Sequence, residues 1–319
     1  MPIVSSTYSP PFYLKNGHLA TILPSSFRKV EGVQYERERI DTPDGDFLDI
    51  DWSKNNNSDQ LVIVSHGLEG SSLRPYVQGV VKYFNEQGWS ALAWNCRSCS
   101  GEINRVPRFY HHGATEDLAQ VVDHATNKQN YRSIVLVGFS MGGSMTLKYL
   151  GERDVDPLIK SGVAFSVPVD LQSGVDELAK KNKSFYRKRF LKKLAVKIKA
   201  KAEKFPELVD ATGVDEIEHF PTFDNRYTAP LHGFKNAEDF YDKASSKHYL
   251  STIKVPTLLV NAFNDPFLAD ECYPEELCRS SSSLYLEMPK FGGHVGFSLS
   301  GKKYSYMEQR AFEFIKQYI

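Results

Sequence analysis

Cysteine is scarce in this sequence, and neither sign of charge is in excess. The four cysteines, Cys96, Cys99, Cys272 and Cys278, are too few for a disulfide-stabilised scaffold and are typical of a reducing compartment. Lysine plus arginine and aspartate plus glutamate both total 39, so the net charge is zero. A neutral chain has no general electrostatic attraction for nucleic acid or membranes, so we expect no nucleic-acid partner.

Hydrophobic runs are short, and the pattern of a metal site is missing. No run approaches the ~18 apolar residues of a membrane span, and residues 1–5 lack the basic and apolar regions of a signal peptide. We therefore expect a cytoplasmic protein with no integral membrane anchor. The pair Cys96-x-x-Cys99 has neither a second cysteine pair nor histidines at ligand spacing, which disfavours a metal or redox site.

The sequence does contain a regular alternation of strand and helix patterns along 319 residues, 41% of them hydrophobic. From residue 61 onward, strand-like runs alternate with amphipathic segments such as 77–87 and 114–126, which predicts right-handed βαβ units. The expected strands are 35–40, 47–52, 61–65, 90–95, 133–137, 162–166, 257–262 and 284–288. We predict an α/β fold built on an eight-stranded, mostly parallel sheet with helices on both faces.

The alternation stops after the sixth expected strand. Residues 170–250 are helical, loop-rich and charged, and the strand pattern resumes near Thr257. We predict a core domain of residues 1–169 and 251–319, with a helical cap inserted at 170–250. Residues 1–34 are expected to form an irregular arm that wraps on the core.

A serine at the apex of a strand-to-helix turn is the most informative local feature. The apolar run 133–137 leads into Gly138-Phe139-Ser140-Met141-Gly142, and a helix pattern follows. The two arms of such a turn come so close that side chains at Gly138 and Gly142 would clash, which explains both glycines. We expect Ser140 to have a strained backbone and an exposed, nucleophilic hydroxyl.

A serine nucleophile needs a base to accept its proton and an acid to orient that base. Loops that follow parallel strands meet at one edge of the sheet, so both partners should follow later strands. Asp265 comes after the strand 257–262, and His294 lies in a glycine-rich loop after the strand 284–288. We predict a catalytic triad of Ser140, Asp265 and His294, with Asp270 as a less favoured acid.

The predicted chemistry also requires donors for a negatively charged oxygen. These are expected to be two backbone N–H groups, one from Met141, directly after the nucleophile, and one from the loop His66-Gly67-Leu68 after the strand 61–65. We therefore predict an oxyanion hole made by the amides of Leu68 and Met141, with Gly67 allowing the loop to turn inward.

A strongly basic segment, residues 180–204, lies inside the predicted cap. Its apolar residues recur at helical spacing, which predicts an amphipathic helix. Such a helix could cover the active site with its apolar face and keep its lysines in water. Weak contact with an anionic membrane surface is the alternative. We favour the first interpretation because the rest of the chain cancels this charge.

Several motifs together resemble the YheT-like branch of the α/β-hydrolase superfamily, and the resemblance extends over nearly the whole chain. The matching segments are 16–22 (NGHLATI), 66–70 (HGLEG), 95–101 (NCRSCSG), 110–118 (YHHGATEDL), 138–142 (GFSMG) and 227–234 (YTAPLHGF). The resemblance implies the α/β-hydrolase fold and a serine esterase that needs no cofactor. It implies the same Ser140, Asp265 and His294 triad.

The resulting prediction is hydrolysis of a lipophilic, short- to medium-chain carboxylic ester through an acyl-enzyme. Two alternatives remain, namely acyl transfer to an alcohol on the same triad and a non-catalytic ligand-binding homologue. The pair His112 and Asp117 has the H-x4-D spacing that invites the acyltransferase interpretation. We prefer a structural role, because Asp117 falls in the first turn of an expected helix, where acids are stabilising. The residues that bind the substrate cannot be named from the sequence.

Overall fold

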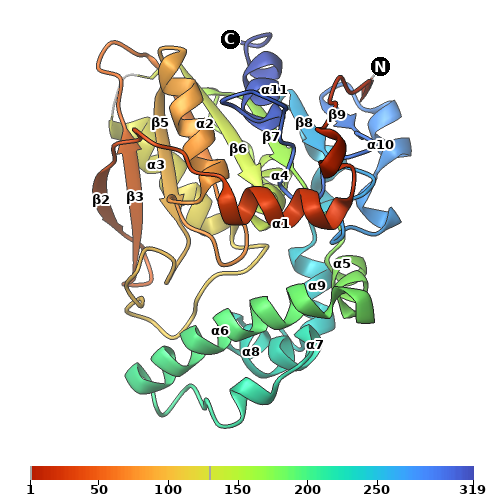
Figure 1. Cartoon of the computed structure of the whole chain (residues 1–319). Coiled ribbons are helices and arrows are strands. Elements are labelled where there is room, and N and C mark those ends of the chain that lie inside the picture. The colour runs from red at the N-terminus through yellow and green to blue at the C-terminus, as the bar shows by residue number, and fades with distance from the viewer. Residues whose placement is uncertain (1, 129–130) are drawn as a thin grey trace.

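A single mixed sheet organises the computed structural model of the chain, which describes residues 2–128 and 131–319 (Figure 1). Within these residues the sheet has nine strands in the order β1-β9-β8-β7-β6-β4-β5-β3-β2. The strands are β1 (Ile3–Val4), β2 (Glu36–Asp41), β3 (Phe47–Ser53), β4 (Gln60–Ser65), β5 (Ser90–Asn95), β6 (Ser133–Phe139), β7 (Ile159–Phe165), β8 (Thr257–Val260) and β9 (Leu284–Glu287). β2 and β3 pair antiparallel with their neighbours, and the remaining pairs are parallel.

The predicted α/β fold is confirmed, with one strand more than expected. All eight predicted strands are present, with their ends shifted by a few residues. The additional strand is β1, which pairs with β9 at the edge of the sheet. A strand of two residues is too short to show a period-two pattern, so β1 could not be recognised from the sequence.

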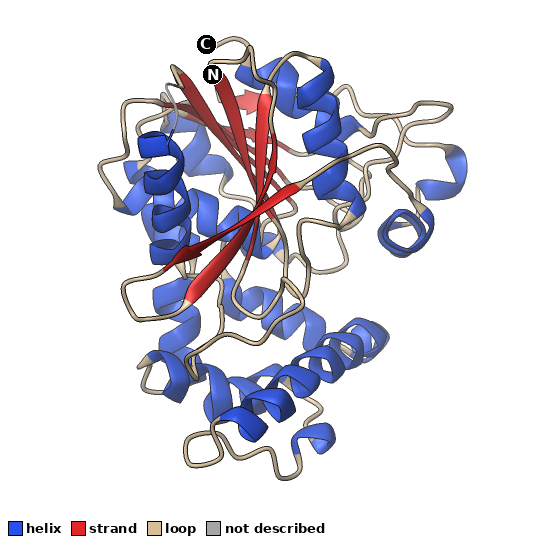
Figure 2. Ribbon diagram, turned by 90° about the vertical axis from the view of Figure 1, so that its left-hand side faces the viewer, coloured by secondary structure: helices blue, strands red, loops and turns tan. Residues whose placement is uncertain are grey.

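Helices cover both faces of the sheet, as Figure 2 shows. They are α1 (Gly17–Phe27), α2 (Pro75–Glu86), α3 (Thr115–Lys128), α4 (Met141–Glu152), α10 (Glu275–Ser280) and α11 (Tyr306–Ile315). Alternate residues of β4 divide between two cores. Leu61 and Ile63 pack in the core with α3 and α4, whereas Val62 and Val64 pack in the core with α2 and α11. A strand buried on both faces explains the continuous apolar run in this part of the sequence.

The residues between β7 and β8 form a helical layer beyond the end of the sheet (Figure 1). Its elements are α5 (Leu171–Ala179), η2 (Lys181–Lys183), α6 (Ser184–Lys204), η3 (Val214–Glu216), α7 (Phe220–Phe223), the π-helix η4 (Asp224–Thr228), α8 (Ala229–His232), α9 (Ala237–Ala244) and η5 (Ser246–Thr252). Because β1 precedes the predicted strands, this layer follows the seventh strand of the structure, not the sixth. The division of the chain into a core and a cap domain stays a prediction.

The basic segment does form the long helix α6, but not all of its cations lie in water. Lys201 is fully buried, and its ammonium donates hydrogen bonds to the backbone carbonyls of Val106 at 2.5 Å and Arg108 at 2.9 Å. Arg187 is also buried and donates to the carbonyl of Glu218 at 2.7 Å. The expectation that this helix keeps its lysines in water is therefore wrong for Lys201, because loop carbonyls at the helix–core boundary replace water there.

The N-terminal arm is more regular than predicted. It contains β1, the 3₁₀ turn η1 (Phe12–Leu14) and the helix α1. The Asn16 side chain caps α1 by accepting hydrogen bonds from the amides of His18 and Leu19. None of the helices in the described part of the chain combines the length and apolar character needed to span a lipid bilayer.

Candidate active site

The turn between β6 and α4 holds Ser140 in a rare backbone conformation. Its φ is 53° and its ψ is −118°, a combination that costs energy for a residue with a side chain. A Cβ on Gly138 would collide with the carbonyl oxygen of Gly142, and a Cβ on Gly142 would collide with that of Ser65. The steric reason given for both glycines is confirmed, and the tight turn leaves the Ser140 hydroxyl at the C-terminal edge of the sheet.

Three side chains from three different loops form a continuous chain of hydrogen bonds at this edge. The Ser140 Oγ lies 2.9 Å from His294 Nε2. On the other side of the imidazole, Nδ1 lies 2.9 Å from Asp265 Oδ2 and 3.1 Å from Oδ1. The Asp265 carboxylate is fully buried and also accepts a hydrogen bond from the amide of Phe267. Asp270 is instead exposed, at the start of η6 (Asp270–Cys272).

This geometry suits proton transfer from the serine. A buried carboxylate that accepts the Nδ1 proton holds the imidazole in the tautomer whose Nε2 is free to accept a proton. Phe267 packs on the imidazole, with ring centroids 4.0 Å apart. The ring is thus positioned by an ion–dipole contact at one edge and by an aromatic contact on one face.

The predicted oxyanion-hole amides lie beside Ser140. A Cβ on Gly67 would be 3.1 Å from the Cβ of Ser140, so the loop after β4 passes directly against the nucleophile. Neither Leu68 N nor Met141 N has a hydrogen-bond acceptor within residues 2–128 and 131–319. The buried His66 shapes this loop, because its Nε2 accepts from the Cys96 amide at 3.0 Å. Two unused donors next to Ser140 are suited to bind a developing negative charge.

The helix α1 contacts the loops that carry the acid and the base, which the sequence did not reveal. The Thr21 hydroxyl accepts a hydrogen bond from the His294 amide at 2.8 Å and donates to the Gly17 carbonyl at 2.7 Å. The Asn264 side chain accepts from the Gly293 amide and donates to the Lys15 carbonyl. An aspartate at position 264 could not make the second of these bonds. The motif at 16–22 is therefore a brace for the acid and base loops.

Two cavities meet at Ser140 and His294. Both are also lined by Leu68, Phe190 and Phe267. The first, of about 810 Å³, extends between the core and the helical layer and is lined largely by apolar side chains of α5, α6, α7 and α9. The second, of about 970 Å³, extends between α6, α1 and the start of α2. The serine therefore lies where an elongated molecule could occupy both cavities at once.

The few polar groups of the first cavity are largely hydrogen-bonded to each other. The Asp224 carboxyl accepts from Thr228 Oγ1 and from the Tyr241 hydroxyl, both at 2.6 Å. Burial raises the pKa of Asp224 to about 6, and it lowers the pKa of His112, another lining residue, to about 4. Because these polar side chains are hydrogen-bonded or uncharged, the first cavity is suited to bind a hydrocarbon chain.

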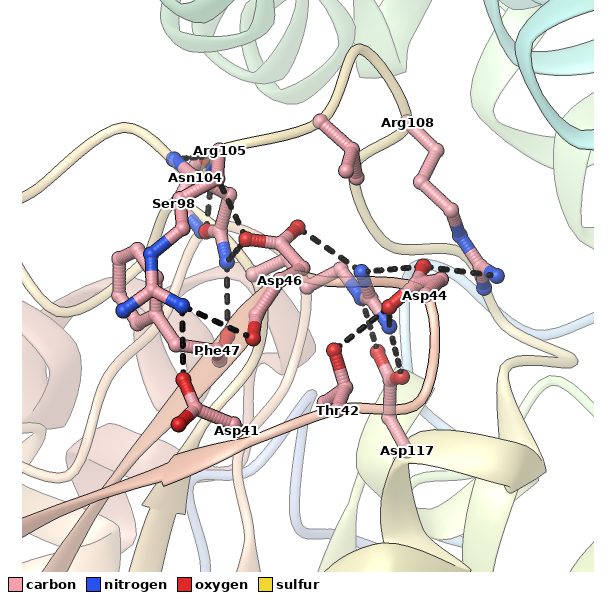
Figure 3. Close-up of polar contacts among 12 residues, drawn as sticks. Asp41, Thr42, Asp44, Asp46, Phe47, Ser98, Asn104, Arg105, Arg108 and Asp117 are labelled. Carbon is pink, nitrogen blue, oxygen red and sulfur yellow. Dashed lines mark hydrogen bonds and ion pairs between the residues drawn. The ribbon is translucent and has the colours of Figure 1, made fainter.

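Asp117 has a structural role, as the position in a helix indicated. Its carboxylate pairs with the buried guanidinium of Arg97, which also pairs with Asp44 and Asp46 at 2.9 and 2.8 Å. Figure 3 labels the three carboxylates, Asp44, Asp46 and Asp117. This cluster ties the β2–β3 turn to the start of α3. Both Asp117 oxygens are taken by Arg97, whereas His112 lines the first cavity. The H-x4-D pair is thus divided between two different environments.

The cysteines and acidic groups show no arrangement typical of a metal centre. All four cysteines are free thiols, and burial raises the pKa of Cys96 well above its ordinary value. Cys99 Sγ lies 3.0 Å from the Nζ of Lys197. Within the described residues, no three histidine, cysteine, aspartate or glutamate side chains are grouped so that they could hold a metal ion.

Comparison with known proteins places this chain among hydrolases. Residues 56–280 match the family described as serine aminopeptidase S33. The chain is 31% identical to the putative esterase YheT of Escherichia coli over 92% of this chain and 87% of that protein. It is 29% identical to the phospholipase ABHD3 of Mus musculus, over 99% and 79% respectively. The Pyrococcus furiosus esterase Pf2001 has a similar fold, with a TM-score of 0.60, 19% identity and coverage of 99% and 98%.

Proposed function

Because the chain belongs to the serine aminopeptidase S33 family of α/β-hydrolases and is a relative of YheT, we propose that it hydrolyses carboxylic esters through an acyl-enzyme on Ser140. The observation that carries the proposal is the chain of hydrogen bonds from Ser140 through His294 to the buried Asp265. It opens into an apolar cavity large enough for a small-molecule substrate.

In the proposed mechanism, His294 Nε2 accepts the Ser140 proton while Oγ attacks the ester carbonyl. Asp265 stabilises the imidazolium that forms, and the amides of Leu68 and Met141 donate to the oxyanion. When the tetrahedral intermediate collapses, His294 passes its proton to the departing alcohol. Water then attacks the acyl carbonyl while His294 accepts its proton, and His294 returns this proton to Ser140 Oγ as the bond to the acid breaks.

We further propose that residues 170–250 act as a cap that selects the acyl group. Residues of α5, α6, α7, η4 and α9 contribute somewhat more than half of the lining of the first cavity, whereas the core contributes the reacting groups. An acyl chain in this cavity would be removed from water at about 25 cal/mol per Å² of apolar surface. Lipophilic short- to medium-chain acyl esters are therefore the proposed substrates.

Steady-state turnover of p-nitrophenyl esters from acetate to octanoate tests the proposal. We expect Ser140→Ala to lower kcat at least about 10³-fold, because the nucleophile and its base act as one unit. Ser144→Ala is the matched control, since Ser144 lies one turn further along α4 and lines neither cavity. It should stay within about twofold of the wild type. Equal residual activity in Ser140→Ala and the wild type would refute the mechanism.

Product analysis with ethanol present distinguishes hydrolysis from the predicted alternative of acyl transfer. The proposal requires the free acid as the main product. An ethyl ester in excess over the free acid would identify the chain as an acyltransferase on the same residues. Absence of any turnover, with Ser140 unreactive towards a fluorophosphonate, would identify a non-catalytic homologue.

A further inference from the structure

The second cavity differs from the first in its charge. Its lining includes four cationic side chains, Arg28, Arg74, Arg189 and Lys193, and no carboxylate. Arg28 is neutralised by the buried Glu308, with Nη2 2.7 Å from Oε1. This leaves three cations, Arg74, Arg189 and Lys193, which we call the cationic cluster. The two cavities that meet at Ser140 therefore differ, because the first is largely apolar and the second is positively charged.

The cationic cluster has no acidic partner. In the parts of the chain that the structure describes, none of its members lies within 4.0 Å of a carboxylate oxygen of an aspartate or glutamate side chain. The nearby Glu69 is already used, because its Oε1 lies 2.8 Å from Lys197 Nζ and also accepts from the Tyr110 hydroxyl. Lys193 itself only reaches the Glu69 backbone carbonyl, at 3.5 Å. The positive charge in the cavity is therefore not balanced by the protein.

The members of the cluster also oppose one another. Arg189 and Lys193 are one turn apart on α6, where like charges are destabilising. Arg74 approaches from the other side of the cavity, as the residue that precedes α2. Burial, Arg74 and Arg189 all lower the pKa of Lys193, and Glu69 only partly opposes them. An anion between these side chains would remove this repulsion.

The start of α2 adds to the same potential. Pro75, at the first position of the helix, and Tyr76 line the cavity together with Arg74. The N-terminal end of a helix carries partial positive charge and favours anions, phosphate in particular. Arginine offers a planar fork of donors and lysine a point charge, and both are typical of phosphate sites.

From these observations we infer that the cationic cluster is a subsite for a phosphate group on the alcohol part of the ester. The inference rests on the proposed function and specifies its substrate class, namely acyl esters of phosphorylated alcohols such as 1-acyl-glycerol 3-phosphate. The acyl chain would occupy the first cavity and the ester carbon would lie at Ser140. The alcohol would extend into the second cavity, where His294 can protonate its oxygen as it leaves.

Two esters that differ only in the phosphate test the inference. For 1-octanoyl-glycerol 3-phosphate over 1-octanoyl-glycerol, both below their micellar concentrations, we expect a kcat/KM ratio of at least about 10 in the wild type. Lys193→Gln and Arg74→Gln should each lower this ratio about five- to tenfold, because each removes one charge-assisted contact. Lys192→Gln is the matched control, since Lys192 is an exposed neighbour on α6 that does not line the cavity.

A binding measurement separates this inference from the proposed function. Calorimetry of the Ser140→Ala variant should show binding of sn-glycerol 3-phosphate but not of glycerol, and Lys193→Gln should weaken it. If neither ester is hydrolysed while this binding persists, the proposed function fails and the subsite stands. A wild-type ratio near one without binding would overturn the subsite. An equal effect of Lys192→Gln and Lys193→Gln would also overturn the subsite. The preference for the phosphorylated ester would then be explained by the general positive charge of the surface, of the kind that attracts a protein to an anionic membrane.

Discussion

The brace formed by α1 leads to a prediction at Thr21, which holds the loop of the catalytic base and also lines the second cavity. Thr21→Val keeps the size and branching of the side chain and removes its hydroxyl. In the structure this hydroxyl is the acceptor for the His294 amide, at 2.8 Å, and Thr21 is only 7% exposed. The substitution therefore leaves the amide of the catalytic base without its partner.

The cost follows from the unsatisfied amide. An unpaired, largely buried donor costs about 1–3 kcal/mol. If the base loop keeps its position, the free energy of unfolding falls by this amount. If the loop moves to reach water, His294 Nε2 leaves its 2.9 Å contact with Ser140. The activation free energy of the reaction then rises by a similar amount, and kcat falls about 10- to 100-fold. We expect the second outcome, because the loop is glycine-rich on both sides of His294.

The assay is turnover of p-nitrophenyl butyrate, with urea unfolding of each variant measured in parallel. Thr21→Ser retains the hydroxyl and should recover most of kcat. Ser26→Ala is the control on the same helix, since Ser26 is exposed and lines neither cavity. A Thr21→Val variant with wild-type kcat and wild-type stability would refute the role of α1 as a brace.

Two further predictions concern stability. Arg97→Met leaves three carboxylates without their shared cation and should lower the free energy of unfolding, measured by urea titration, by about 3–5 kcal/mol. Arg132 is exposed, so the control Arg132→Met should change this free energy by less than about 0.5 kcal/mol. Equal effects of the two substitutions would contradict the structural role of the cluster. Burial lowers the pKa of His66 to about 4 and that of His111 well below its ordinary value. Holding these histidines neutral contributes to stability above their unfolded pKa of about 6.5, and this contribution is lost as the pH falls towards 4. For His66 alone, the free energy of unfolding should therefore fall by about 1 kcal/mol between pH 7.5 and pH 5.5. Unchanged or greater stability at pH 5.5 would show that these histidines are not held neutral.

The predictable parts of the fold were those with strong local patterns. Long apolar strands such as 133–137 and the strand–glycine–serine–helix pattern around Ser140 depend on nearest neighbours in sequence. β1 was missed because two residues carry no periodicity, and it forms only because β9 offers a free edge. The buried Lys201 could not be foreseen, because its acceptors lie in a loop about 90 residues away.

Some residues of the candidate site could also be predicted from local sequence patterns, whereas others could not. Ser140, Asp265 and His294 could be named because each follows an identifiable strand. Thr21 and Asn264 could not be assigned roles, because their partners are backbone groups of a distant segment. The one available signal was the Asn16 helix cap in the motif 16–22, which predicts a helix rather than an irregular arm. The charge of the second cavity arises from side chains of α2 and α6 that only the fold brings together.

Ser140 is proposed as the nucleophile, and covalent labelling of this residue is a direct test of that role. Purified protein is treated with a fluorophosphonate, digested and mapped by mass spectrometry, and ester hydrolysis is followed in the same sample. We expect a single adduct on Ser140, formed in proportion to the loss of activity and absent in His294→Ala, where the proton acceptor is missing. Full loss of activity with the adduct on another residue, or continued hydrolysis after Ser140 is fully labelled, would contradict it.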